Sequence, residues 1–140
     1  MKRAGVLAYV DSSVIVARIF GEPHPGAIDL STTTGIVTSE IARVECLRAI
    51  DGRRSELTAE DIAELTKRLA ATLVDTTVTR LSAAVLKRAG EAFPTRIRTL
   101  DALHVATALL LSGQTNVVFH THDRAQGATA QACGLVVRGV

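Results

Sequence analysis

The feature that most constrains the fold is a regular alternation of short apolar runs with longer helix-like segments. Strand-length apolar runs occur at residues 5–10, 35–38 and 116–120, and shorter candidates at 74–78 and 135–137. Strands that are apolar throughout are typical of parallel sheets, in which helices cover both faces. Their alternation with helices predicts an α/β domain with a central, mostly parallel sheet.

Helical patterns fill the intervals between these strands. The predicted helices span residues 12–20, 39 to about 52 (with Ser39 as its cap), 58–73, 81–93, 102–111 and 124–133. The segment 58–73 is the clearest, because it is amphipathic and because Thr58 with Asp61 resembles a capping box. The segment 102–111 is apolar nearly all round, so we expect it to be buried.

Length and composition limit the classes of function. A chain of 140 residues, 47% of them hydrophobic, predicts one domain spanning residues 1–140. With 3% aromatic residues and no Trp, a base-stacking platform for single-stranded nucleic acid is improbable. Cys46 and Cys133 indicate buried apolar positions, not a disulfide framework. No signal peptide follows the first three residues and no apolar run could span a membrane, so we expect a cytoplasmic protein.

Acidic residues stand where predicted strands meet helices. Asp11 ends the first strand, Asp123 follows a later one, Asp101 opens the apolar helix and Glu45 lies on an inward stripe. Since ligand sites in parallel sheets form at the carboxyl ends of strands, Asp11 and Asp123 can share one edge. Helix capping is the simpler interpretation for each Asp taken alone. It does not explain Glu45, although a surface pair with Arg48 would.

Four carboxylates in one place require a counterion. At about 5 Å they would repel by roughly 3 kcal/mol per pair at an effective dielectric constant of 20. Mg²⁺ or Mn²⁺ suits oxygen ligands, whereas the four His lack zinc spacing and are interpreted as structural. Glu40 is interpreted as a helix-start acid, because it lies about 140° around the helix from Glu45. Without the four acids the net charge of +2 becomes +6, which suits a phosphodiester substrate.

Four segments together resemble the PIN-domain family, and most closely its VapC-type toxins. They are YVDSSVIVA (residues 9–17), VTSEIARVECLRAI (37–50), RTLDALHVATALLL (98–111) and HTHDRAQGATAQACGLVV (120–137). The third, with its Leu-Asp-Ala-Leu-His pattern, is the most specific. The four occur in the family's order and span almost the whole chain.

The resemblance implies a three-layer α/β/α fold and an Mg²⁺- or Mn²⁺-dependent endoribonuclease. Such a protein would be the toxin of a type II toxin–antitoxin module, a homodimer with an RNA substrate and a cognate antitoxin. The implied acidic metal ligands are Asp11, Glu45, Asp101 and Asp123, with supporting hydroxyls from Ser12 and Thr121. Arginines near the acids in sequence are candidate RNA contacts, with solvated surface positions as an equal alternative: Arg43, Arg48, Arg96, Arg98 and Arg124.

Other classes of protein fit less well. A phospho-acceptor signalling domain would need an adjacent acidic pair and a late Lys, and no Lys follows Lys87. A haloacid-dehalogenase-type phosphatase would need a second Asp where Ser13 stands. A non-catalytic RNA- or antitoxin-binding PIN domain is the main alternative, and a structure-specific DNA nuclease is the nearest rival among the nucleases.

Overall fold

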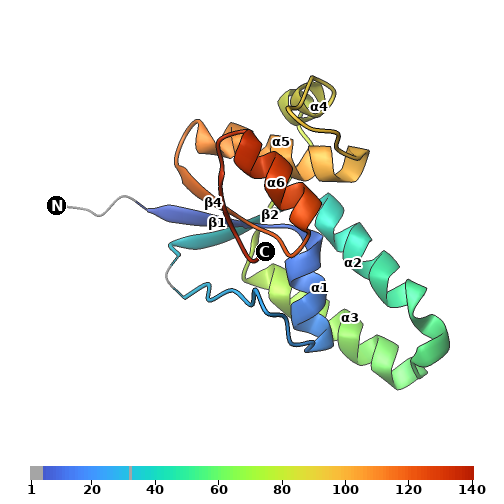
Figure 1. Cartoon of the computed structure of the whole chain (residues 1–140). Coiled ribbons are helices and arrows are strands. Elements are labelled where there is room, and N and C mark those ends of the chain that lie inside the picture. The colour runs from blue at the N-terminus through green and yellow to red at the C-terminus, as the bar shows by residue number, and fades with distance from the viewer. Residues whose placement is uncertain (1–4, 32) are drawn as a thin grey trace.

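The computed structural model describes residues 5–31 and 33–140, and its centre is a five-stranded sheet (Figure 1). The strands are β1 (Val6–Val10), β2 (Gly35–Ser39), β3 (Thr77–Thr79), β4 (Asn116–His120) and β5 (Val136–Arg138). Their order is β3-β2-β1-β4-β5 and every pairing is parallel. The predicted α/β class with a parallel sheet is therefore confirmed. The first three residues, on which the signal-peptide argument rests, lie outside the described part.

Six α-helices and one short 3-10 helix connect the strands. They are α1 (Ser12–Phe20), α2 (Ile41–Gly52), η1 (Arg54–Glu56), α3 (Ala59–Val74), α4 (Ala83–Ala89), α5 (Thr99–Ser112) and α6 (Arg124–Ala132). The capping box of α3 is present, with Thr58 and Asp61 each accepting from the other's backbone N–H. No helix in the described residues is long and apolar enough to cross a membrane.

Several predicted boundaries are wrong by a few residues. The helix α3 continues through Val74, so β3 begins later than residue 74. The helix α4 is shorter than predicted, because Ser82 caps its start and Gly90 follows its last residue. The cap of α2 is Glu40 and not Ser39. The Glu40 carboxylate accepts from the backbone N–H of Leu81 at 2.7 Å, which ties the start of α2 to the segment before α4.

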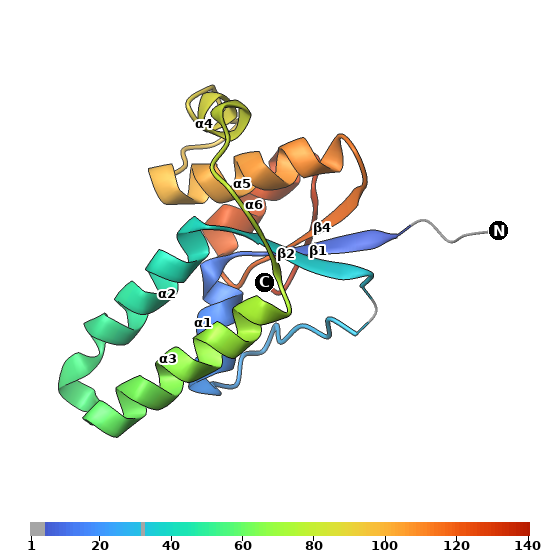
Figure 2. The ribbon, with the colours of Figure 1, turned by 180° about the vertical axis from the view of Figure 1, so that it is seen from behind.

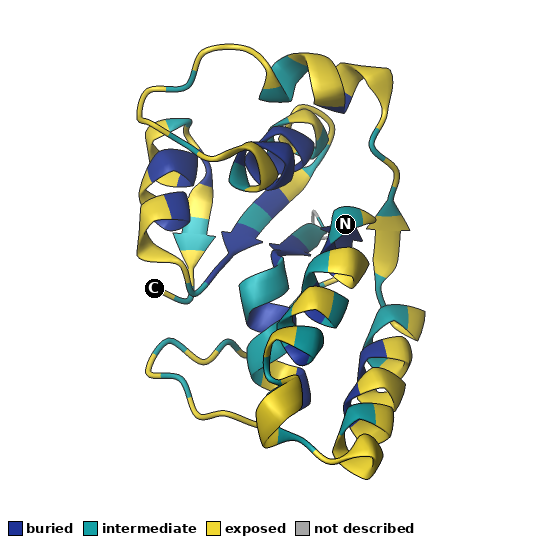
Figure 3. Ribbon diagram, turned by 90° about the vertical axis from the view of Figure 1, so that its right-hand side faces the viewer, coloured by how far each residue is buried: buried dark blue, intermediate teal, exposed yellow. Residues whose placement is uncertain are grey.

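Helices cover both faces of the sheet, as Figures 1 and 2 show. Val10 packs with buried residues of α1, α2 and α3 in one core. Tyr9, the preceding residue, belongs to a second core with residues of α5 and α6, where its ring stacks on Phe119 at 5.4 Å. Figure 3 shows the buried residues concentrated in the central strands and on the inward sides of helices. Coverage on both faces explains why the strands are apolar throughout.

The order of strands fixes where a site can form. From β1 the chain first builds outward through β2 and β3, and then returns to the other side of β1 to add β4 and β5. The connections after β1 and β4 therefore leave the same edge in opposite directions, which is where open parallel sheets form ligand sites. The backbone N–H of Asp11 donates to the carbonyl of His120 at 3.2 Å, which holds these two strand ends together.

Candidate active site

Asp11 lies at this divergence, buried at the end of β1 and in the cap position of α1. Its Oδ1 accepts from the Ser13 hydroxyl at 2.6 Å and from the backbone N–H of Val14 at 3.3 Å. Its Oδ2 accepts from the Thr121 hydroxyl at 2.6 Å. Burial raises the pKa of Asp11 even though these hydrogen bonds favour its charged form. A buried carboxylate bonded only to neutral donors is short of positive charge.

Thr121 connects this carboxylate to the start of α6. Its buried hydroxyl oxygen accepts from the backbone N–H of Asp123 at 3.0 Å and lies 3.1 Å from Oε1 of Gln126. Asp123 caps α6, with its Oδ1 accepting from the backbone N–H of Gln126 at 3.1 Å. The buried Gln126 side chain also reaches the carbonyl of Asp101 at 3.5 Å. These bonds connect the carboxylate of Asp11 and the cap of α6 to the backbone of Asp101.

Glu45 is connected by hydrogen bonds to two buried side chains, those of His104 and Tyr9. Its Oε1 lies 2.6 Å from Nε2 of His104, whose Nδ1 lies 2.6 Å from the hydroxyl of Tyr9. Burial, and next the charge of Asp11, raise the pKa of Tyr9 well above its ordinary value, so Tyr9 keeps its proton and donates to Nδ1. With Nδ1 accepting from Tyr9, Nε2 of His104 carries the N–H that donates to the Glu45 carboxylate. The alternative pairing of Glu45 with Arg48 is wrong, because Arg48 pairs with Asp51 at 3.1 Å.

Asp101 lies in the first turn of α5 and opens onto a groove of about 680 Å³. Asp123 lines the same groove, with Arg96 and Arg98 from the segment before α5. Burial, and next repulsion from Asp123, raise the pKa of Asp101, and Asp11 and Glu45 contribute in the same direction. The four predicted acids therefore influence one another electrostatically, although they come from four separate parts of the chain.

The four carboxylates do not form a ready-made metal site. Across residues 5–31 and 33–140, no group of three or more His, Cys, Asp or Glu side chains is arranged to hold a metal ion. Asp11, Glu45 and Asp123 each accept hydrogen bonds from their own surroundings. The donor set nevertheless fits a hard divalent cation, because all the ligands are oxygens and burial raises the pKa of two of them.

The remaining predicted residues have mixed positions. Arg96 and Arg98 line the acidic groove, whereas Arg43, Arg48 and Arg124 are exposed and are not among the residues lining it. Thr121 contacts Asp11 as the resemblance implies, but the serine that contacts it is Ser13. Ser12 is the first residue of α1, and its supporting role remains a prediction.

Three contacts at the site were missed by sequence reasoning, namely those of Ser13, His104 and Gln126. His104 lies one helical turn after Asp101, which could have placed it on the same side of α5. Its link to Tyr9 joins residues that are 95 positions apart, and its link to Glu45 spans 59 positions. No local pattern predicts such pairs, because they depend on how the helices pack on the sheet.

Comparison with known proteins agrees with this fold. The PIN domain family model matches residues 8–131. Ribonuclease VapC46 from Mycobacterium tuberculosis (strain ATCC 25618 / H37Rv) is 34% identical over 131 residues, covering 92% of this chain and 94% of that protein. FitAcB from Neisseria gonorrhoeae has a TM-score of 0.71 at 16% identity, covering 93% of this chain and 95% of that one. A toxin–antitoxin complex from Klebsiella pneumoniae has a TM-score of 0.62 at 15% identity, covering 89% and 93%.

The parallel five-stranded sheet with helices on both faces defines a three-layer α/β/α domain. The chain belongs to the PIN-domain family. Its relative VapC46 is a ribonuclease of the VapC type, so the resemblance to this branch is confirmed. The two solved structures, at identities below 25%, show the shared fold alone.

Proposed function

We propose that this protein is a divalent-metal-dependent endoribonuclease and the toxin of a type II toxin–antitoxin module. The observation that carries the proposal is the buried Asp11 carboxylate at the end of β1, bonded to Thr121, with Asp101 and Asp123 on the wall of the neighbouring groove. A cation near them would replace the positive charge that their hydrogen-bond donors do not supply. The 34% identical relative, which is named a ribonuclease, supports the same activity.

The proposed metal ligands are Asp11, Asp101, Glu45 and Asp123, with Mg²⁺ or Mn²⁺ as the ion. When bound, such an ion lowers the pKa of a coordinated water and neutralises charge on a phosphate group. The Ser13 and Thr121 hydroxyls orient Asp11, while His104 orients Glu45. Such supporting contacts orient the individual ligands of metal sites and tune the bound metal.

The groove beside Asp101 is the proposed position of the RNA strand. Arg96 and Arg98 on its wall would bind backbone phosphates and orient the scissile bond. Asp101, on the wall of the groove, would accept the proton of the attacking water. Hydrolysis by water leaves a 5′-phosphate and a 3′-hydroxyl, so products ending in a 2′,3′-cyclic phosphate would contradict the mechanism.

Partners follow from the same proposal. The structure from Klebsiella pneumoniae is a toxin–antitoxin complex, which supports a cognate antitoxin for this chain. We further propose a homodimer and one domain over residues 1–140. Light scattering on the protein purified without antitoxin measures the oligomeric state, and a monomer would remove the homodimer from the proposal.

The test is cleavage of total small RNA by the purified protein with Mg²⁺, Mn²⁺ or EDTA. We expect metal-dependent cleavage that falls to background in Asp11→Asn and Asp101→Asn and is unchanged in Glu91→Gln, an exposed acid that does not line the groove. Thermal unfolding provides the control for folding. In EDTA at pH 7, Asp101→Asn should melt at least as high as the unmodified protein, because its charge is disfavoured in the folded state.

The same melts separate catalysis from binding. A ligand that binds only the folded state raises its stability, so Mg²⁺ should raise the melting temperature of the unmodified protein more than that of Asp11→Asn. Cleavage that persists in both Asn variants would contradict the site. Stabilisation by Mg²⁺ with no cleavage of any RNA would favour the alternative, a PIN domain that binds RNA or antitoxin without catalysis.

A further inference from the structure

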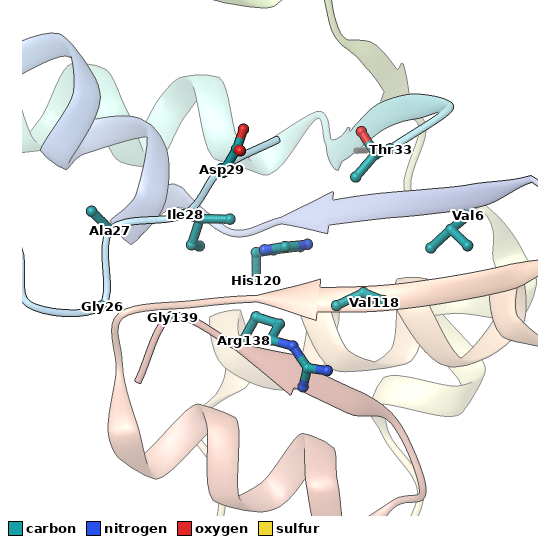
Figure 4. Close-up of a pocket in the computed structure, with 10 residues that line it drawn as sticks. All are labelled: Val6, Gly26, Ala27, Ile28, Asp29, Thr33, Val118, His120, Arg138 and Gly139. Atoms are coloured by element: carbon teal, nitrogen blue, oxygen red, sulfur yellow. The ribbon is translucent and has the colours of Figure 1, made fainter. Parts of the chain in front are cut away.

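A second cavity lies on the other side of the same strand ends. Its volume is about 510 Å³, and it is enclosed by β1, β4 and β5 together with the segment between α1 and β2 (Figure 4). It shares no lining residue with the acidic groove. Its lining residues are Val6, Gly26, Ala27, Ile28, Asp29, Thr33, Val118, His120, Arg138 and Gly139.

His120, the last residue of β4, points into this cavity. Its ring lies between Ile28 and Val118 in Figure 4, and only 4% of the residue is exposed. Among the contacts of the described residues, neither ring nitrogen has a hydrogen-bond partner. A buried polar group without a partner costs roughly 1–3 kcal/mol. The ring is therefore oriented toward a space that, with an occupant, could supply the missing hydrogen bonds.

The charges around the ring are mostly positive. Burial, followed by the charges of Arg138 on β5, Arg18 on α1 and His122 after β4, lowers the pKa of His120 to about 4. Asp29 is the acid on the cavity wall. The ring is therefore neutral at pH 7, with one nitrogen donating and the other accepting. Arg138 also lines the cavity, where its Nη1 donates to the carbonyl of Val137 at 2.9 Å and its guanidinium points away from the His120 ring (Figure 4). An anion at the imidazole N–H would draw this guanidinium toward it by a change of rotamer.

The remaining wall is apolar or backbone. Val6, Ile28 and Val118 contribute hydrocarbon surface. A space of this volume falls within the range of about 300–1,000 Å³ for small-molecule sites, in which a few polar groups orient a largely apolar ligand. It is larger than an inorganic ion requires.

We propose that this cavity is a second binding site, which takes a small organic oxyanion of mononucleotide size. Arg138 and His120 bind its anionic group, and Val6, Ile28 and Val118 contact the remainder of the ligand. The site is separate from the proposed nuclease function, and the proposal does not depend on that function.

The probe is uridine 5′-monophosphate, titrated by calorimetry in EDTA so that no metal bridges it to the acidic groove. Inorganic phosphate and uridine are titrated in parallel. We expect the nucleotide to bind at least ten-fold tighter than either fragment, because the anionic group and the remainder of the ligand contribute together. Phosphate binding as tightly as the nucleotide would overturn the organic ligand, and no binding of the nucleotide at millimolar concentration would overturn the site.

Variants locate the binding. His120→Gln and Arg138→Gln should each weaken nucleotide affinity about ten-fold or more, whereas Arg88→Gln, a cation away from the cavity wall, should not. Asp11→Asn should retain binding, since the acidic groove is not involved. Equal affinity in all four variants would mean adventitious surface binding and would contradict the proposal. Thermal unfolding of each variant confirms that it is folded.

The ring signals of His120 provide a readout of direct contact. Bound nucleotide should shift these signals in nuclear magnetic resonance spectra recorded at pH 7, and uridine alone should shift them less. Ring signals of His120 that do not move at saturating nucleotide would contradict direct contact.

Discussion

At the scale of single residues, the acidic site depends on side chains that hold other side chains. His104 is the clearest example, because it is 1% exposed and joins Glu45 to the buried hydroxyl of Tyr9. The pair fixes both the position of the carboxylate and the tautomer of the imidazole. His104 thus acts as a positioning residue for a proposed metal ligand.

Replacing His104 by Leu should reduce the apparent affinity for Mg²⁺ more than it reduces the stability of the fold. Supporting partners of metal ligands typically contribute about 10–100-fold in affinity or activity. We expect the Mg²⁺ concentration for half-maximal cleavage to rise by about that factor, measured by Mg²⁺ titration of RNA cleavage.

Tyr9→Phe is the matched comparison, because it removes only the hydroxyl that contacts His104. We expect Tyr9→Phe also to raise the Mg²⁺ concentration for half-maximal cleavage, but by less than His104→Leu does. The reason is that one hydrogen bond contributes about 1 kcal/mol. An unchanged Mg²⁺ requirement in His104→Leu would show that Glu45 needs no support.

At the scale of elements, caps decide where helices begin and can be tested one at a time. The α3 helix begins with the Thr58–Asp61 capping box. Thr58→Ala should lower the free energy of unfolding by about 1 kcal/mol and leave RNA cleavage unchanged. Chemical denaturation measures the first quantity. Thr66→Ala is the control, because the Thr66 hydroxyl donates to the carbonyl of Ile62 within the same helix and does not cap it. An equal loss in both variants would contradict the role of the cap.

Local sequence signals predicted many of the helices and strands correctly. The range of α1, the capping box and three of the apolar strands lie where periodicity and turn residues put them. The prediction of β3 was wrong because Val74, which is 81% exposed, reads as a strand residue but continues α3 as an outward-facing position. Whether a valine is buried depends on the folded molecule, so the residue type alone did not predict that Val74 is exposed.

The candidate site also has parts that the sequence predicts and parts that it does not. The acids could be predicted, because each stands at a junction or on an apolar stripe. Their partners could not, since Thr121 reaches Asp11 across 110 positions and Gln126 reaches Asp101 across 25. The difference between Ser12 and Ser13 depends on one helical position, which only the backbone geometry of α1 decides.

At the scale of the whole molecule, the buried His120 couples folding to pH. Its pKa in the folded state is about 4, below its ordinary value of 6.5. Since the unfolded chain takes up the proton first, stability is complete above about pH 6.5 and decreases as the pH falls toward 4. The loss reaches about 3 kcal/mol from this group.

Urea unfolding at pH 7, 6 and 5 measures this dependence. The free energy of unfolding of His120→Gln should fall less steeply over that range than that of the unmodified protein. His24→Gln is the matched control, because it removes a partly exposed ring that stacks on His122 outside the cavity wall. Parallel pH profiles for His120→Gln and the unmodified protein would contradict the burial of an uncharged ring.

The two outer strands of the sheet, β3 and β5, are each three residues long. A sheet edge offers unpaired backbone groups to any chain that meets it, and short edges limit the aggregation that results. A neighbouring molecule could gain only a few hydrogen bonds by adding a strand here. Self-association of this protein should therefore proceed through its helical surfaces, and concentrated preparations should resist the growth of fibrils.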